Sequence, residues 1–80
     1  MSAVRPVLSE LDVRVLRATD ARLVRTAERV AERAGCAEDV VKSTLGRLRA
    51  RMLVEDDGYV GRRRGWLRTY AGDAALEHQL

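Results

Sequence analysis

Apolar residues recur at helical spacing along much of the chain, and the longest such segment follows a glycine. After Gly35, the pattern predicts a turn and then a helix of about fifteen residues that ends at Leu53 and Val54. We expect its apolar stripe to be buried, and the stripe consists of Val41, Leu45, Leu48 and Met52. The opposite side is polar and mostly cationic, with Lys42, Ser43, Arg47, Arg49 and Arg51. One face therefore packs on a core. The other is free to meet a negatively charged partner, or it is an ordinary exposed face on which some of the arginines pair with Glu55 or Asp56.

A first helix is predicted ahead of this segment, beginning at a capping serine. Ser9 is placed as an N-cap, with Asp12 three residues later as a variant of the capping box. Leu8 and Val13 have the spacing of a hydrophobic staple around that cap. The helix is expected to end near Ala18 and to turn three apolar residues inward, namely Leu11, Val15 and Leu16.

The segment from residue 20 to residue 34 fits two patterns. It fits a single helix whose apolar stripe is Leu23, Ala27, Val30, Ala31 and Ala34. Alternatively, residues 22–25 form a short strand, and Thr26 caps a brief helix over 27–34. The sequence Arg-Leu-Val-Arg before a capping residue favours the strand. Gly35 ends the helix, because glycine readily adopts the positive φ of that position.

The pattern changes after Arg51 from a helical period to that of strands. Residues 53–60 and 66–69 are candidate strands of a hairpin, joined by the loop 61–65. Asp57–Gly58 is a second candidate for the turn, because Asp-Gly is a strong two-residue hairpin signal. We favour the loop because it brings residues 66–67 back toward 53–54, and because it then presents three arginines at the tip, Arg62, Arg63 and Arg64.

Length and composition fit a single domain over residues 1–80. A hydrophobic content of 46% is enough for a small core, which must be mostly aliphatic. Residues 1–8 form a loose lead-in, and residues 71–79 form a last short helix with Ala71, Ala74, Ala75 and Leu76.

Cys36 is the single cysteine, so we expect no internal disulfide, and we expect Cys36 to be a small core residue. The chain has no run of 18 apolar residues, so we expect a cytoplasmic protein with no membrane segment.

The distribution of charge favours a nucleic-acid partner. The 15 basic residues exceed the 12 acidic ones by three, and all of the basic residues but Lys42 are arginine, which binds phosphate and base edges bidentately. Residues 42–68 hold a net charge of +5 and the rest of the chain holds −2. The cationic excess therefore lies in one third of the molecule.

No constellation of residues predicts catalysis or cofactor binding. The sequence has no glycine motif that would cradle phosphate and no paired histidine and cysteine ligands for a metal. His78 is the single histidine and has no neighbouring nucleophile in the sequence. We therefore expect a protein that is not an enzyme and has no metal or cofactor.

A motif from Thr26 to Val54 resembles the winged helix-turn-helix family of bacterial and phage transcriptional regulators. The matching residues have the family's spacing and are Thr26, Val30, Ala31, Gly35, Cys36, Val41, Leu45, Leu48, Leu53 and Val54. Three features depart from it. Ala37 replaces the usual capping hydroxyl, the acids Glu38 and Asp39 begin the long helix, and Met52 replaces the usual glycine before the Leu-Val pair.

The resemblance implies an α+β, mostly helical fold with a three-helix core, a short hairpin wing and a terminal helix. It implies a helix-turn-helix over residues 26–51 and a wing over 53–69. The long helix would enter the major groove of double-stranded DNA. Its contacts would be Asp39, Lys42 and Ser43 at base edges, Val40 at a thymine methyl and Arg47 near phosphates. The wing residues Arg62, Arg63 and Arg64 would reach the backbone or the minor groove.

The resemblance also implies a regulatory role. We expect sequence-specific DNA binding, as in a repressor, with the first and last helices as surfaces for a homodimer. The alternative is a winged helix that docks on another protein without binding DNA directly. The acids Glu38 and Asp39, together with those at 55–57, motivate this alternative.

Overall fold

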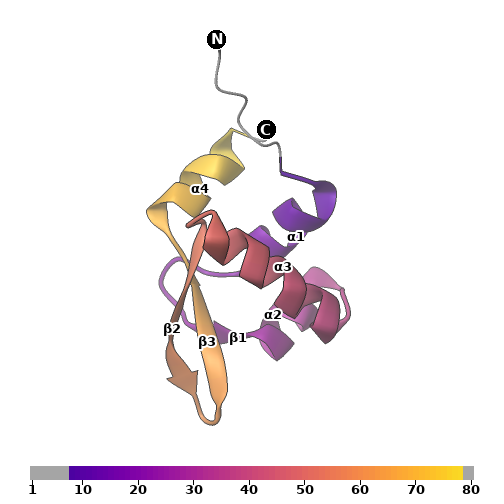
Figure 1. Cartoon of the computed structure of the whole chain (residues 1–80), viewed down its shortest axis with the longest axis vertical. Helices are drawn as coiled ribbons and strands as arrows, with labels where there is room; N and C mark the ends of the chain where they lie inside the picture. Colours follow the sequence, from indigo (N-terminus) through magenta and orange to yellow (C-terminus); the bar gives the residue numbers. More distant parts are fainter. Residues whose placement is uncertain (1–7, 79–80) are drawn as a thin grey trace.

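A computed structural model describes residues 8–78, so most of the predicted lead-in and the last two residues lie outside the described part of the chain. Within that part, four helices and three strands follow one another in the order expected of a winged helix (Figure 1). They are α1 (Glu10–Ala18), β1 (Arg25–Thr26), α2 (Ala27–Ala34), α3 (Glu38–Ala50), β2 (Val54–Val60), β3 (Arg63–Arg68) and α4 (Tyr70–Glu77).

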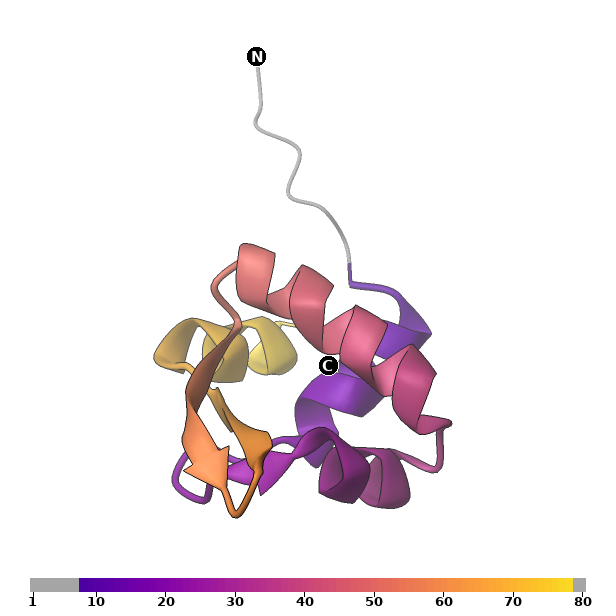
Figure 2. The ribbon, with the colours of Figure 1, turned by 60° about the horizontal axis from the view of Figure 1, so that its bottom comes forward.

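The helices α1, α2 and α3 pack on one another, and the hairpin of β2 and β3 extends away from them (Figure 1). The sheet is antiparallel with the order β1-β3-β2, and α4 contacts α1. In the view that brings the hairpin forward, α1, α2 and α3 lie together on one side of the hairpin (Figure 2). The core lies among these helices and consists mainly of Val15, Leu16, Val30, Val41, Leu45, Leu48, Val54 and Trp66.

The caps predicted for the first two helices are present. Ser9 Oγ accepts a hydrogen bond from the Asp12 N–H at 3.1 Å, and Asp12 Oδ2 accepts one from the Ser9 N–H at 3.3 Å. Thr26 Oγ1 accepts from the Arg29 N–H at 3.2 Å at the start of α2. Gly35 ends α2 in the left-handed conformation, with a φ of 70°. These local signals specify where the helices begin and end.

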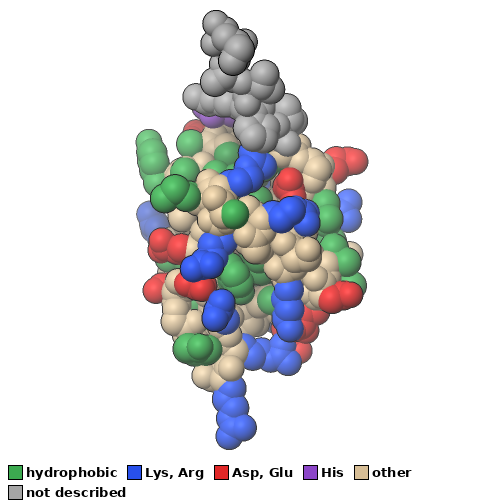
Figure 3. Space-filling view, viewed as in Figure 1, with side chains coloured by type: hydrophobic (Ala, Val, Ile, Leu, Met, Phe, Trp, Pro, Cys, Tyr) green, Lys and Arg blue, Asp and Glu red, His purple; other side chains and the backbone are tan. Residues whose placement is uncertain are grey.

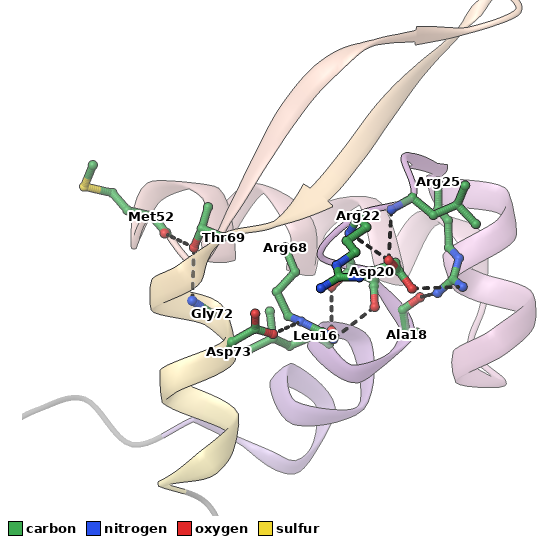
Figure 4. Close-up of polar contacts among 12 residues, drawn as sticks. Leu16, Ala18, Asp20, Arg22, Arg25, Met52, Arg68, Thr69, Gly72 and Asp73 are labelled. Carbon is green, nitrogen blue, oxygen red and sulfur yellow. Dashed lines mark hydrogen bonds and ion pairs between the residues drawn. The ribbon is translucent and has the colours of Figure 1, made fainter.

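The single-helix alternative for residues 20–34 is wrong, and the short strand is present but lies at Arg25–Thr26, so it overlaps the expected strand 22–25 only at Arg25. Only Arg25 and Thr26 pair with β3, and residues before them form a turn around Asp20. The Asp20 carboxylate accepts hydrogen bonds from the backbone N–H groups of Arg22 and Leu23, at 2.8 and 2.9 Å (Figure 4). Leu23, which the single-helix alternative placed on a buried stripe, is 59% exposed.

The hairpin turns at Gly61 and Arg62, within the favoured loop, and its second strand begins three residues earlier than expected. Val60 pairs with Arg63, so Arg63 and Arg64 belong to β3 and not to the tip. The alternative turn at 57–58 is wrong, because those residues lie at a shift of register between Asp56 and Tyr59. The Asp-Gly pair therefore accommodates a bulge in a strand that continues past it.

Met52 does not continue the buried stripe of α3, and the expectation that it does is wrong. The helix ends at Ala50, and Met52 is 74% exposed with a φ of 64°. The Met52 N–H donates a hydrogen bond to the Arg49 carbonyl at 2.9 Å, and the Leu53 N–H donates one to the Leu48 carbonyl at 2.9 Å. This pattern is a Schellman motif, in which the left-handed position is usually glycine. The chain turns sharply there, so Leu53 is buried instead.

Replacing Met52 with glycine is expected to stabilise the protein. A left-handed conformation costs a residue with a side chain about 1–2 kcal/mol, and glycine's greater freedom in the unfolded chain offsets part of that gain. We expect a net gain of about 0.5–1 kcal/mol, which raises the midpoint of thermal unfolding by a few degrees. The matched control is Ala50→Gly at the helical end of the same motif, which should lower the midpoint. If the midpoint of thermal unfolding of Met52→Gly lies below that of the wild type, the left-handed conformation of Met52 is not strained.

Gly72 allows α4 to pack closely against the start of the wing. A Cβ atom at this position would lie 2.2 Å from the Leu53 carbonyl oxygen and 2.8 Å from Arg68 Cγ. The same Leu53 carbonyl accepts a hydrogen bond from the Thr69 N–H at 3.1 Å. The first turn of α4 therefore lies directly on the chain that leaves α3, which holds the base of the wing in place.

Candidate nucleic-acid interface

The outer face of α3 presents the predicted contact residues to solvent. Asp39, Val40, Lys42, Ser43 and Arg47 are all exposed. The opposite stripe is buried and consists of Val41, Thr44, Leu45 and Leu48. This division follows from the spacing of apolar residues, which places every third or fourth position on the core side.

The middle of the exposed face carries small side chains. Ser43, Gly46 and Ala50 follow one another at helical spacing and are exposed. A Cβ atom at Gly46 would meet nothing within 4 Å, so no neighbour in the fold requires this glycine. It makes the helix less stable by about 1 kcal/mol relative to alanine. Its effect is a low surface over which another molecule can approach the helix backbone.

The cations around this face are paired with carboxylates of the same chain. Arg47 Nη2 lies 3.2 Å from Asp12 Oδ1, which turns this side chain toward α1. Lys42 Nζ lies 3.2 Å from Glu38 Oε2 one turn earlier, a spacing at which opposite charges meet on a helix. The cations of these pairs are largely exposed, so each pair adds little to stability.

Two carboxylates connect α3 to the wing. Glu38 Oε2, which pairs with Lys42, also lies 3.0 Å from Nη1 of Arg63. Asp56 Oδ2 lies 3.3 Å from Nη1 of Arg64 and 3.6 Å from Nε of Arg49. We call these the Glu38 bridge and the Asp56 bridge. Each joins one cation of α3 to one arginine of β3.

A cleft of about 390 Å³ lies between α3 and the wing. Its lining residues are Ala27, Glu38, Lys42, Arg63, Arg64 and Trp66. Three predicted contact residues, Lys42, Arg63 and Arg64, therefore converge on one place. Arg47 lies apart from them toward α1, and Arg62 occupies the hairpin tip with no ion pair in the described part of the chain. Figure 3 shows basic side chains, with acidic ones among them, from α3 down to the tip of the hairpin.

Sequence reasoning missed the Glu38 carboxylate as an organiser of this surface, and it offered Asp56 only as a partner for the arginines of α3. The four-residue spacing of Glu38 and Lys42 is a signal for one half of the Glu38 bridge. The other half joins residues 25 positions apart and has no local signal. The pair of Arg49 with Asp56 agrees with the pairing that the sequence suggested, whereas the pair of Asp56 with Arg64 has no such signal.

Arg68 and Arg25 are not part of the interface, although Arg68 belongs to the cationic third of the sequence. Arg68 Nη1 donates to the carbonyls of Leu16 and Thr19 at 2.9 and 3.0 Å, and its Nε donates to Asp73 Oδ1 at 2.6 Å (Figure 4). Arg25 Nη1 donates to the Ala18 carbonyl at 2.9 Å. Both arginines therefore bind the carbonyl end of α1, where positive charge is favourable.

The turn at Asp20 lowers the pKa of its carboxyl group. The largest causes are the hydrogen bonds from the backbone N–H groups of Arg22 and Leu23, and the charges of Arg25 and Arg68 add to them. All four favour the ionised form. This carboxylate therefore helps to hold the connection between α1 and β1.

This shift predicts how stability depends on pH. Because the pKa of Asp20 is lower in the folded protein than in the unfolded chain, its stabilising contribution is present at neutral pH and is lost as the pH falls through the folded value. Asp20→Asn should therefore unfold at a lower temperature than the wild type at pH 7, and the gap should narrow as the solution is acidified toward pH 3. Thermal unfolding followed by circular dichroism measures both proteins. A gap that stays constant over this range would contradict the assignment, and Glu28→Gln is the control for loss of one exposed carboxylate.

No group of three or more histidine, cysteine, aspartate or glutamate side chains between residues 8 and 78 is placed to hold a metal ion. None of the helices in the same range has the length and apolar character needed to cross a membrane.

The three-helix core, the short sheet and the hairpin define a winged helix-turn-helix fold. No protein-family model matches the chain, and no curated protein matches it. Solved structures do match. BpsR of Bordetella bronchiseptica aligns with a TM-score of 0.80 and 22% identity over 91% of this chain and 53% of its own. A MarR-family transcriptional regulator from Silicibacter pomeroyi aligns with a TM-score of 0.79 and 22% identity over 89% of this chain and 49% of its own.

A third structure is more similar in size. A putative DNA-binding protein from Ralstonia eutropha aligns with a TM-score of 0.73 and 19% identity over 90% of this chain and 96% of its own. The chain thus spans about half the length of the first two structures and nearly all of the third. At these identities the likeness concerns the fold.

Proposed function

We propose that the chain is a transcriptional regulator that binds double-stranded DNA in a sequence-specific way. The observation that carries the proposal is the convergence of exposed α3 residues and wing arginines on one cleft, at Lys42, Arg63 and Arg64. A major groove of B-DNA admits one helix, and flanking phosphates attract arginine. A helix and a cationic wing on the same side of a small domain fit that shape and charge.

The residue roles follow from position on the helix. Asp39, Lys42 and Ser43 occupy the first turns of α3 and read base edges, and the adjacent Val40 contacts a thymine methyl. Arg47 lies one turn further on and contacts phosphate. Because Gly46 has no side chain, the DNA backbone at the edge of the major groove can approach the helix closely there. The wing places Arg62, Arg63 and Arg64 along the flanking backbone or in a narrow minor groove.

The similar structures support this proposal by their described activities. The BpsR structure is described as explaining the regulation of DNA binding, and the Silicibacter pomeroyi protein is described as a transcriptional regulator. By the same analogy we propose a cytoplasmic repressor of bacterial or phage origin, with no catalytic activity. Dimerisation through α1 and α4 would place two copies of α3 on successive half-sites.

A second candidate function is docking on another protein. Met52 and Tyr70 are 74% and 89% exposed, and the Thr69 hydroxyl next to Tyr70 donates to the Met52 carbonyl at 2.8 Å. Large apolar side chains exposed together at the junction of α3 and α4 are typical of contact surfaces.

Selection of bound sequences from a random pool of duplex DNA tests the proposal. Enrichment of one motif, and an affinity that falls steeply with salt, are expected of a DNA-binding regulator. Failure to enrich any sequence, combined with a protein partner that is retained after nuclease treatment, would favour docking instead.

A further inference from the structure

We propose that Glu38 determines how well the α3 surface discriminates between DNA sequences. Its carboxylate holds Lys42 and Arg63 until a DNA base with a suitable donor takes their place at the carboxylate. The inference rests on the proposed DNA binding. It assigns a role in specificity to a residue at which a DNA-binding surface would be expected to avoid negative charge.

One carboxylate oxygen serves both cations. Lys42 Nζ and Arg63 Nη1 lie 3.2 and 3.0 Å from Glu38 Oε2. The side chains of Lys42 and Arg63 are 63% and 52% exposed, whereas that of Glu38 is 33% exposed. The cations are thus accessible to a phosphate group, but the carboxylate already occupies the position between them that a phosphate oxygen would take.

This arrangement weakens binding to every duplex by a similar amount. A phosphate that approaches Lys42 and Arg63 must displace Glu38 or remain close to its negative charge. Fewer counterions are released when the protein's own carboxylate already neutralises these cations, so the electrostatic part of the affinity falls. That part supplies most of the binding to unrelated sequences. The Glu38 bridge therefore limits non-specific binding above all.

A correct sequence compensates for the loss. Glu38 is the first residue of α3 and lines the cleft next to Lys42, so its released carboxylate faces the same groove as the base-reading residues. A carboxylate accepts a hydrogen bond from the amino group of cytosine, whereas guanine and thymine present acceptor atoms and adenine presents its amino group beside the acceptor N7. A site with cytosine at the position that Glu38 meets therefore accepts the carboxylate best, and it frees Lys42 for a base edge and Arg63 for phosphate.

The Asp56 bridge provides a matched comparison. Asp56 also holds one cation of α3 and one wing arginine, Arg49 and Arg64, but it lies on β2 and not at the start of the recognition helix. Its release should strengthen binding to all sequences without changing base preference. Glu28, exposed in the first turn of α2, supplies the control for loss of one negative charge.

The test compares the wild type with Glu38→Gln, Asp56→Asn and Glu28→Gln. Binding to a random duplex is measured over a range of salt concentrations, and each protein is used to select sequences from a random pool. Near 0.1 M salt one phosphate contact contributes slightly less than a factor of ten, so Glu38→Gln should bind the random duplex about tenfold more tightly. The slope of log K against log salt should become more negative by about one unit. The preference for cytosine at one position should fall about tenfold.

The controls separate the outcomes. Asp56→Asn should gain affinity and keep the selected sequence, and Glu28→Gln should match the wild type within about twofold. Equal affinity, slope and selected sequence in Glu38→Gln and Glu28→Gln would overturn the inference while leaving DNA binding intact. Absence of binding by all four proteins would overturn the proposed function as well. Binding by Glu38→Gln alone would overturn the role in discrimination, because the wild type would then bind no sequence that compensates for the bridge. Glu38→Ala with an unchanged circular dichroism spectrum repeats the test without the amide.

Discussion

Replacing Arg68 with methionine is expected to lower the free energy of unfolding by about 2–4 kcal/mol, a large fraction of the stability of a domain of this size. The side chain is 17% exposed and donates to the carbonyls of Leu16 and Thr19 and to the Asp73 carboxylate. Methionine retains the apolar stem but removes the charged donor from the Thr19 carbonyl and the Asp73 carboxylate, whereas the Leu16 carbonyl still accepts from Thr19. Buried acceptors that lose a charged partner lose more free energy than the hydrogen bond itself provides.

Denaturant unfolding followed by the fluorescence of Trp66 measures this change, because the chain has one tryptophan and its side chain is buried. The matched variant is Arg64→Met on the same strand. The Arg64 side chain is 54% exposed, and its one ion pair within residues 8–78 is with Asp56, so its replacement should cost less than about 1 kcal/mol. Similar losses in the two variants would show that the contacts of Arg68 with α1 and α4 contribute little.

The consequence of the Arg68 contacts extends to the wing. Arg68 is the last residue of β3, and its own N–H donates to the Asp20 carbonyl at 2.8 Å. One residue thus connects the end of the wing, the end of α1 and the first turn of α4. Because β3 begins at Arg63, the same strand carries the arginines of the cleft. The position of those arginines relative to α3 depends on this connection.

Signals within a few residues of one another made most of the fold predictable. The spacing of Ser9 and Asp12 specifies the start of α1, and Thr26 and Gly35 specify both ends of α2. The apolar spacing of Val41, Leu45 and Leu48 specifies the buried side of α3. Each of these signals acts through neighbouring backbone groups or through one face of one helix, and a sequence shows both.

The positions that the sequence mispredicts depend on partners far away in the chain. Met52 has the correct spacing for the buried stripe, but Leu53 must reach the core and the wing must leave α3, so the helix ends first. Arg63 and Arg64 look like loop residues beside Gly65. They join β3 because Val60 and Tyr59 pair with them across the hairpin. A local pattern contains no information on such pairings.

The candidate site was predictable as a surface but not as a set of charges. The exposed residues of α3 follow from the period of the helix, and the turn that carries Arg62 follows from its flanking glycine. The net charge of the region suggested free cations. Instead, Glu38 and Asp56 neutralise four of them, two on α3 and two on β3. The sequence gives the number of charges in a segment, whereas the affinity for DNA depends on which of these charges a phosphate group can reach.

Replacing Arg62, Arg63 and Arg64 together with alanine is expected to weaken duplex DNA binding by about a hundredfold near 0.1 M salt. Arg62 lies at the tip and is exposed, so it meets the backbone without releasing another partner. Arg63 and Arg64 must first leave their carboxylates, which makes their individual contributions smaller. Their removal also leaves Glu38 and Asp56 with less compensating charge beside the DNA. The slope of log K against log salt should become less negative by about one unit for each phosphate that the variant no longer neutralises.

The matched control removes three arginines from the other end of the molecule. Arg14, Arg17 and Arg33 are exposed on α1 and α2 and line a separate hollow there. Their replacement with alanine changes the net charge by the same amount and leaves the wing intact. If the wing arginines contact DNA, the control should lose less than about tenfold in affinity, through the general field of the protein alone. Equal losses and equal slopes in the two triple variants would mean that net charge, and not the position of the wing, determines the affinity.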